Sequence, residues 1–265
     1  MGCFKAREIV LGLSVRCRGE WKEIYDIIEK KKKIEDEEIQ EAIRNQKSSF
    51  VCITDESFPE CLKNVYQPPF LLYYYGDISL LSRRRRLTAI GTRAPNSYQE
   101  KMMKKLIGET IEHFNGDLVV VSGMAIGLDG IAMKEAMHRG APIIAVLGSG
   151  IDAPYPSENI DIYDYCRSGK GLVLSEYPGK TEPLASHFTF RNRILAATGK
   201  VCFIGGGKIR SGTSSTARQA LELGRDILSL PCDVSGDDLT NSLIQDGARP
   251  VLSYVDIVEA IKENS

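Results

Sequence analysis

The sequence predicts an α/β protein whose parallel sheet is doubly wound, with helices on both faces. Short apolar runs alternate along the chain with segments that repeat apolar residues at the helix period. The clearest pair lies within residues 87–129, where apolar runs at 87–90 and 118–121 each end in small residues and precede a helical segment. Such dense, β-branched runs are typical of strands that are buried on both faces.

Length and composition fit a globular protein. The chain has 265 residues, of which 43% are hydrophobic and 26% charged, enough for one large α/β domain and a small appendage. A net charge of -1 gives no global attraction to nucleic acid or to a membrane, so a polyanion site would have to be a local patch. No apolar run approaches the roughly 20 residues that span a bilayer, and the N-terminus has no secretory pattern.

The cysteines are scattered and form no CxxC pair, so neither a metal site nor a disulfide framework is indicated. We therefore expect reduced thiols, a cytoplasmic protein and no metal. The seven positions are Cys3, Cys17, Cys52, Cys61, Cys166, Cys202 and Cys232.

Residues 5–47 are expected to be helical, because apolar residues from Trp21 to Ile28 fall on one stripe. Strands are expected at 50–54 and 70–75, with a short helix opened by Pro59 between them. The arginine run at 83–86 precedes the strand at 87–90. Because open α/β sheets bind ligands at the carboxyl ends of their strands, we expect this run to be the solvated start of a strand and not a binding patch.

Strands and helices continue to alternate after residue 129. Strands are expected at 142–147, 171–174, 201–204 and 227–230, and helices at 160–166, 189–198, 216–223, 239–245 and 254–262. Residues 179–188 and 208–215 are expected to be loops.

The carboxyl ends of these strands carry glycine, hydroxyl and guanidinium groups. Glycine lets the backbone approach a phosphate, arginine binds it bidentately, and free N–H groups at helix N-termini attract anions. The residues expected in this crevice are Gly91, Arg93, Ser122, Gly123, Arg191, Arg193, Lys208, Ser211 and Gly212.

The crevice is poor in catalytic groups. Two interpretations stay open for His187: it stacks on a base, or it is a surface loop residue. Asp129 is expected to brace a loop or a helix start. Neither GxGxxG nor GxxxxGK[ST] occurs, so neither a standard dinucleotide site nor a Walker P-loop is indicated.

Arg191 and Arg193 lie two residues apart near an expected helix start. Their side chains should diverge by about 200° on a helix. We expect one of them to reach the crevice and the other to brace the loop or to pair with an acid such as Asp129 or Glu176.

Seven segments occur in the order found in one protein family: GTRAPNSY, VSGMAIGLDGIAM, IAVLGSGIDAPYP, LVLSEYP, FTFRNRILA, RSGTSSTARQALELGRDILSLP and NSLIQDGA. With these motifs the chain resembles the DNA-processing protein A family (DprA, also called Smf) from about residue 50 to residue 250. The resemblance implies an extended Rossmann-like domain at 49–265, with a doubly wound, mostly parallel sheet, after a small helical domain at 1–48. Because the sequence stops at Ser265, no C-terminal winged-helix domain is expected.

The resemblance also implies a function without catalysis and without a cofactor. Such proteins bind single-stranded DNA and load RecA recombinase onto it during natural transformation. The arginine of the family's GSR motif is matched by Arg93, and its FPxRNR segment is matched by Phe188, Arg191, Asn192 and Arg193. These matches add Phe188 and Asn192 to the candidate site.

Family members usually act as dimers through the Rossmann-like domain. The apolar segments at 227–230 and 239–262 form the last elements of the expected sheet, and an edge there needs covering. We therefore expect a homodimer through this region.

The chain departs from the family pattern at several positions, including Leu128 and Thr189, where the family usually has isoleucine and proline. Ile126, Met133, Ala185 and Gly205 stand where the family often has arginine, histidine, lysine and glutamate respectively.

Two alternatives to DNA binding remain. One is a nucleotide phosphoribohydrolase of the lysine-decarboxylase-like family, whose PGGxGTxxE motif resembles residues 205–213 but has its glutamate replaced by Thr216 or a neighbour. The other is a nucleotide-sensing module that uses the same phosphate crevice.

Overall fold

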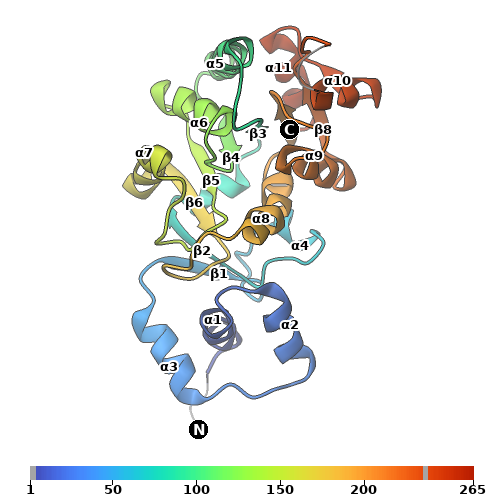
Figure 1. Cartoon of the computed structure of the whole chain (residues 1–265). Coiled ribbons are helices and arrows are strands. Elements are labelled where there is room, and N and C mark those ends of the chain that lie inside the picture. The colour runs from blue at the N-terminus through green and yellow to red at the C-terminus, as the bar shows by residue number, and fades with distance from the viewer. Residues whose placement is uncertain (1–3, 235–237) are drawn as a thin grey trace.

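The computed structural model describes residues 4–234 and 238–265 (Figure 1). These residues contain a nine-stranded sheet in the order β1-β2-β6-β5-β4-β3-β7-β8-β9. The strands are β1 (Ser49–Cys52), β2 (Leu71–Gly76), β3 (Arg86–Ile90), β4 (Val119–Ser122), β5 (Ile143–Val146), β6 (Gly171–Ser175), β7 (Val201–Ile204), β8 (Asp226–Ser229) and β9 (Arg249–Pro250). Strands β3 to β9 pair in parallel, while β1 and β2 add an antiparallel edge. The predicted doubly wound, mostly parallel α/β fold is confirmed.

Helices cover both faces of the sheet. They are α4 (Glu60–Lys63), α5 (Ser97–His113), α6 (Leu128–His138), α7 (Ile160–Tyr165), α8 (Ala185–Thr198), α9 (Gly212–Glu222), α10 (Asp238–Gln245) and α11 (Tyr254–Glu263). Strand β4 shows the division: Val120 packs in the cluster that holds side chains of α5 and α6, whereas Val119 and Val121 pack in the cluster that holds side chains of α8. Successive side chains of a strand point to opposite faces, so one apolar run supplies both cores.

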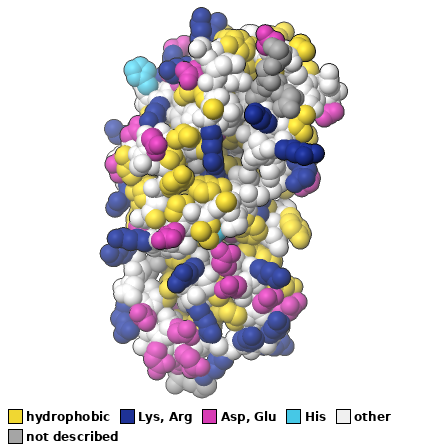
Figure 2. All heavy atoms as spheres, viewed as in Figure 1, with side chains coloured by type: hydrophobic (Ala, Val, Ile, Leu, Met, Phe, Trp, Pro, Cys, Tyr) yellow, Lys and Arg dark blue, Asp and Glu magenta, His cyan; other side chains and the backbone are white. Residues whose placement is uncertain are grey.

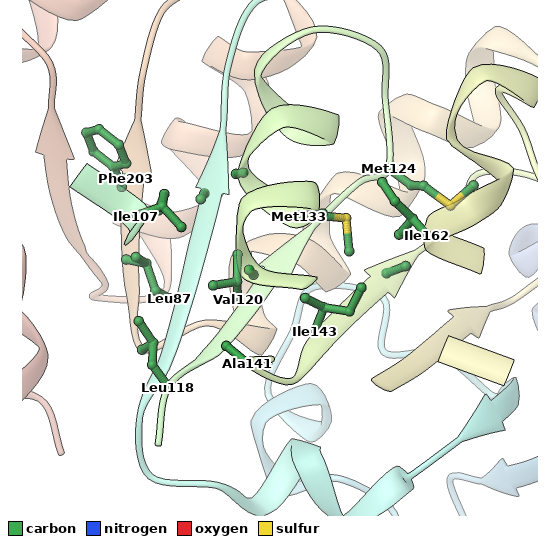
Figure 3. Close-up of a cluster of buried hydrophobic side chains, with 14 of the residues drawn as sticks. Leu87, Ile107, Leu118, Val120, Met124, Met133, Ala141, Ile143, Ile162 and Phe203 are labelled. Atoms are coloured by element: carbon green, nitrogen blue, oxygen red, sulfur yellow. The ribbon is translucent and has the colours of Figure 1, made fainter. Parts of the chain in front are cut away.

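The larger core lies between the sheet and helices α5, α6 and α11. Figure 3 shows Leu87, Val120 and Ile143, from three neighbouring strands, gathered beneath Ile107 of α5 and Met133 of α6. Each of these five side chains is fully buried. This packing holds the carboxyl ends of β3, β4 and β5 in one row, where the candidate site lies.

The N-terminal residues form three helices, α1 (Ala6–Arg16), α2 (Trp21–Glu29) and α3 (Asp36–Asn45), at the opposite end of the molecule from α10 and α11 (Figure 1). They share a small apolar core of their own. Tyr73 of β2 donates a buried hydrogen bond to Ser14 at 2.9 Å, and Trp21 donates to the carbonyl of Pro68 at 2.8 Å. The division into domains at residues 1–48 and 49–265 stays a prediction.

Three sequence-based expectations were wrong. Residues 185–188 and 212–215 are not loop, because α8 begins at Ala185 and α9 at Gly212. The arginine run is not wholly solvated either: Arg86 is only 4% exposed, and its Nε donates to the carbonyl of Thr198 at 2.7 Å. Thr198 ends α8, and the last carbonyls of a helix lack partners within it, so Arg86 caps that helix from the strand next to it.

Candidate nucleic-acid interface

The strand order of the sheet reverses at β3: strands β4, β5 and β6 extend the sheet on one side of β3, and β7, β8 and β9 extend it on the other. Ligands of open α/β sheets bind outside the carboxyl ends of the strands at such a point. Gly91 follows β3, and Gly205 follows β7. The hydroxyl of Thr213, at the start of α9, donates to the carbonyl of Gly91 at 3.1 Å. This bond joins the loop after β3 to the helix that follows β7.

Asp129 organises the floor of this region. Its carboxylate accepts hydrogen bonds from the backbone N–H of Gly91 and of Gly123, both at 3.1 Å. Burial raises the pKa of Asp129 above its ordinary value, while Arg191 and the two N–H donors act against that rise. The brace role expected of Asp129 fits this geometry. The expectation that these strand ends offer free N–H groups to a phosphate was wrong at Gly91 and Gly123, because the protein's own carboxylate takes both.

Arg191 lies beneath the same strand ends. It is 5% exposed, and its Nη1 donates to the carbonyl of Gly123 at 3.1 Å and also to the carbonyl of Val146. Burial lowers its pKa to about 10, so it remains a cation at neutral pH. A Cβ at position 123 would lie 2.7 Å from Nη1 of Arg191, so the close approach requires glycine there. Gly123 therefore makes room for a guanidinium of the protein itself.

Arg193 forms a buried ion pair on the other side of α8. Its Nη1 and Nη2 lie 2.6 and 2.5 Å from the two carboxylate oxygens of Glu176, and its Nε donates to the carbonyl of Gln67 at 2.9 Å. The guanidinium also covers the ring of Phe190, with its centre 3.7 Å from the ring centroid. Arg193 is thus the member of the pair that meets an acid, and Glu176 is one of the two acids expected.

Ser122 and Asn192 also serve the fold. The Ser122 hydroxyl is buried and donates to the carbonyl of Ala89 at 2.6 Å. Asn192 Nδ2 donates to the carbonyl of Gly212 at 3.2 Å, which joins α8 to the start of α9. Ser211 is the N-cap of α9, since its hydroxyl accepts from the N–H of Ser214 at 3.3 Å.

The surface above this floor carries the remaining candidates. Arg93 and Lys208 are exposed, and Phe188 and Ser211 are half-buried. The Arg93 guanidinium lies 5.9 Å from the Phe188 ring centroid, as does that of Arg191 from below. Phe188 rests on Gly148, where a Cβ would approach its ring to 2.6 Å. An exposed cation beside an aromatic ring can bind a phosphate and stack a base at the same place.

His187 has neither of the roles that were left open. It is 2% exposed and stacks on Tyr177, with ring centroids 3.9 Å apart. Its Nε2 lies 2.7 Å from a carboxylate oxygen of Glu20, which comes from the N-terminal helices. His187 therefore joins the start of α8 to the helical N-terminal segment.

Two clefts adjoin this contact, and both lie away from Arg93. The larger, about 1150 Å³, is lined by acidic residues of the N-terminal helices, including Glu20, Glu23, Glu38 and Glu41. Basic residues, Arg16, Arg18, Lys47 and Lys180, line the same cleft, so its charge is mixed. Among residues 4–234 and 238–265 no group of histidine, cysteine and acidic side chains could hold a metal ion. Over the same residues no helix is long and apolar enough to cross a membrane.

One functional candidate was missed by the sequence analysis. Tyr155 lies in the loop after β5, and its ring centroid is 5.7 Å from that of Phe188. A signal for it exists in the sequence, because an aromatic residue in a proline-rich loop directly follows the carboxyl end of an expected strand.

Comparison with known proteins gives one family. The family model described as "DNA recombination-mediator protein A" matches residues 49–262. DNA processing protein DprA of Bacillus subtilis (strain 168) is 34% identical over 228 residues, which cover 84% of this chain and 75% of that protein. DNA processing protein DprA of Streptococcus pneumoniae is 36% identical over 215 residues, covering 80% of this chain and 74% of that protein.

Two solved structures share the fold. The X-ray structure of DNA processing protein A from Streptococcus pneumoniae superposes with a TM-score of 0.78 at 32% identity, over 97% of this chain and 93% of that one. The structure of DNA processing protein A from Helicobacter pylori, described for its single-stranded DNA binding mode, gives a TM-score of 0.72 at 28% identity, over 82% of this chain and 97% of that one. On these matches, this chain belongs to the DNA recombination-mediator protein A family.

Proposed function

We propose that this protein binds single-stranded DNA at the carboxyl ends of β3 and β5, through the exposed guanidinium of Arg93 and the ring of Phe188. The observation that carries the proposal is the placement of this cation beside this ring above a braced floor. The Helicobacter pylori relative, whose structure is described for its single-stranded DNA binding mode, supports it. Lys208 extends the cationic surface beyond β7.

The binding role requires no catalysis. The rival hydrolase motif needs a glutamate near the start of α9, and Thr216 stands there instead. Its hydroxyl is turned to its own helix and donates to the carbonyl of Gly212 at 3.1 Å. We therefore propose a non-enzymatic protein of the cytoplasm that loads RecA recombinase onto the bound strand during DNA uptake, as the family resemblance implies.

The protein acts as a homodimer in this proposal, through the sheet edge at β8 and β9 with helices α10 and α11. Strand β9 is only two residues long. Leu252 and Val255, in this part of the chain, are 81% and 42% exposed. A monomeric mass by light scattering at tens of micromolar protein would contradict this part of the proposal.

The DNA-binding proposal is tested by fluorescence anisotropy with matched single-stranded and double-stranded oligonucleotides over a range of salt concentrations. Phosphate contact with base stacking should favour the flexible single strand, with little sequence preference and with affinity that falls as salt rises. Equal affinity for the duplex and the single strand at one salt concentration would overturn it. A nucleotide-hydrolysis assay on the same preparation tests the rival enzyme.

A further inference from the structure

An exposed apolar patch lies between α7 and α8 on the face that carries Arg93. Figure 2 shows hydrophobic side chains gathered there, with a basic side chain next to them. Ile126, Tyr155 and Leu184 are 40%, 47% and 49% exposed. A contiguous exposed apolar patch on a globular protein commonly marks a binding surface.

The patch is continuous with Phe188. Leu184 is the N-cap residue of α8, and its carbonyl accepts a hydrogen bond from the N–H of Phe188 at 3.4 Å, so the two residues lie one turn apart at the start of the helix. Tyr155 meets Phe188 from the other side at 5.7 Å between centroids, with the ring planes tilted by 52°. Ile126 lies beside the loop after β3, because it precedes Gly127, which packs against that loop. A Cβ on Gly127 would lie 2.4 Å from the backbone oxygen of Thr92.

The loop that carries Tyr155 is anchored at both ends. Before it, the N–H groups of Gly150 and Asp152 donate to the carbonyls of Thr181 and Gly179, both at 2.8 Å. After it, Nδ2 of Asn159 donates to the carbonyls of Met124 and Ala125 at 3.1 and 2.9 Å. An exposed ring on a fixed loop contributes little to the core and loses little freedom when it binds a ligand.

We propose that Tyr155 is a second stacking surface for nucleic-acid bases, and that with Phe188, Leu184 and Ile126 it carries the bases of a single strand whose phosphates run past Arg93. The inference rests on the proposed function and extends the site across the loop between β5 and α7. Every base has a flat face, so such a surface accepts any sequence.

The surroundings favour bases over a protein partner as the occupant. Two guanidinium groups, of Arg93 and Arg191, lie 5.9 Å from the Phe188 ring on which the patch centres. Arg93 and Lys208 are both exposed, and they follow the carboxyl ends of the neighbouring parallel strands β3 and β7. A surface of rings next to cations is complementary to unstacked bases joined by phosphates.

The test compares the native protein with Tyr155→Ala, Tyr155→Phe and the matched control Tyr66→Ala, which removes an 82% exposed ring that lines a different cleft. Fluorescence anisotropy is measured with oligo-dT and with an abasic oligonucleotide of the same length. We expect Tyr155→Ala to weaken oligo-dT binding by about 5-fold to 150-fold, the range for removal of one stacked base, with an unchanged salt slope. Tyr155→Phe and Tyr66→Ala should bind as the native protein does, and the abasic strand should not distinguish Tyr155→Ala from it.

Other outcomes separate the two proposals. If Tyr155→Ala binds oligo-dT as tightly as the native protein while Arg93→Ala loses affinity, Tyr155 is not a base contact and the proposed function stands. If Tyr155→Ala binds oligo-dT as tightly as the native protein but self-associates or binds the recombinase more weakly, the patch is a protein interface. If the native protein binds no single strand, the proposed function fails. A fall in melting temperature for Tyr155→Ala but not for Tyr155→Phe, together with an equal fall in abasic-strand binding, would make the ring structural and overturn the inference.

Discussion

The arginines at the carboxyl ends of the sheet fall into two groups that differ in what surrounds the guanidinium. Arg191 and Arg193 on α8 are each 5% exposed and are bonded to the protein's own carbonyls and carboxylates. Arg93 in the loop after β3 is exposed, and its guanidinium lies beside the ring of Phe188. The comparison shows that arginines of such a motif can serve the fold, because the guanidinium groups of Arg191 and Arg193 are buried against groups of the protein itself. Arg191 supports the floor, Arg193 joins α8 to Glu176 and Gln67, and Arg93 is the one of the three that is exposed.

The largest loss of stability is expected when Arg193 is removed. Arg193→Ala leaves the Glu176 carboxylate buried without its partner, so we expect the free energy of unfolding to fall by about 3–5 kcal/mol in urea denaturation. Arg16→Ala is the matched control, because its pair with Glu38 at 3.3 Å is exposed and should contribute at most about 1 kcal/mol. A stable Arg193→Ala protein that no longer binds DNA would move Arg193 into the contact surface.

A smaller effect is expected from crowding Arg191. Gly123→Ala would place its Cβ 2.7 Å from Nη1 of Arg191 and 2.9 Å from a carboxylate oxygen of Asp129. We expect stability to fall by about 1–3 kcal/mol, the usual cost of overpacking, measured as a lower urea midpoint. Gly212→Ala is the control, because the nearest atom to its added Cβ is 3.9 Å away. Equal stability for both variants would show that the Arg191 pocket is looser than described.

Ser211 should show the smallest effect. Ser211→Ala removes the N-cap of α9 and should cost about 1 kcal/mol, whereas Ser211→Gly should cost only a few tenths. Thermal melting measures both. If Ser211→Ala melts as the native protein does but binds single-stranded DNA more weakly, the hydroxyl belongs to the contact surface and not to the floor.

Much of the fold could be predicted from the sequence, because the strands inside the sheet are dense apolar runs and a helix such as α5 repeats apolar residues along one stripe. The starts of α8 and α9 could not. Ala185–His187 and Gly212–Ser215 carry no apolar repeat. Helix α9 begins after the polar N-cap Ser211, whereas the N-cap of α8 is Leu184, which makes no side-chain capping hydrogen bond. Strand β9, with the sequence Arg249–Pro250, has no strand signal at all.

The candidate site was predictable in location but not in exposure. Its glycines and arginines do lie at the carboxyl ends of the strands. Which of them face solvent depends on partners distant in sequence: Asp129 is 38 residues from Gly91, and Glu20 is 167 residues from His187. No local pattern encodes those meetings, so the free N–H groups expected at Gly91 and Gly123 were assigned to a ligand when a carboxylate of the chain already used them.

The most direct test of the two-group account is the salt dependence of DNA binding by Arg93→Ala, with Arg44→Ala on α3 as an exposed control far from the strand ends. Arg93→Ala should weaken single-strand binding by about 1–3 kcal/mol, the scale of a charge-assisted hydrogen bond. It should also lower the slope of log affinity against log salt by about 0.7 for each phosphate that the side chain no longer neutralises. Its melting temperature should stay that of the native protein. An Arg93→Ala protein that unfolds substantially earlier but keeps its DNA affinity and salt slope would contradict the account.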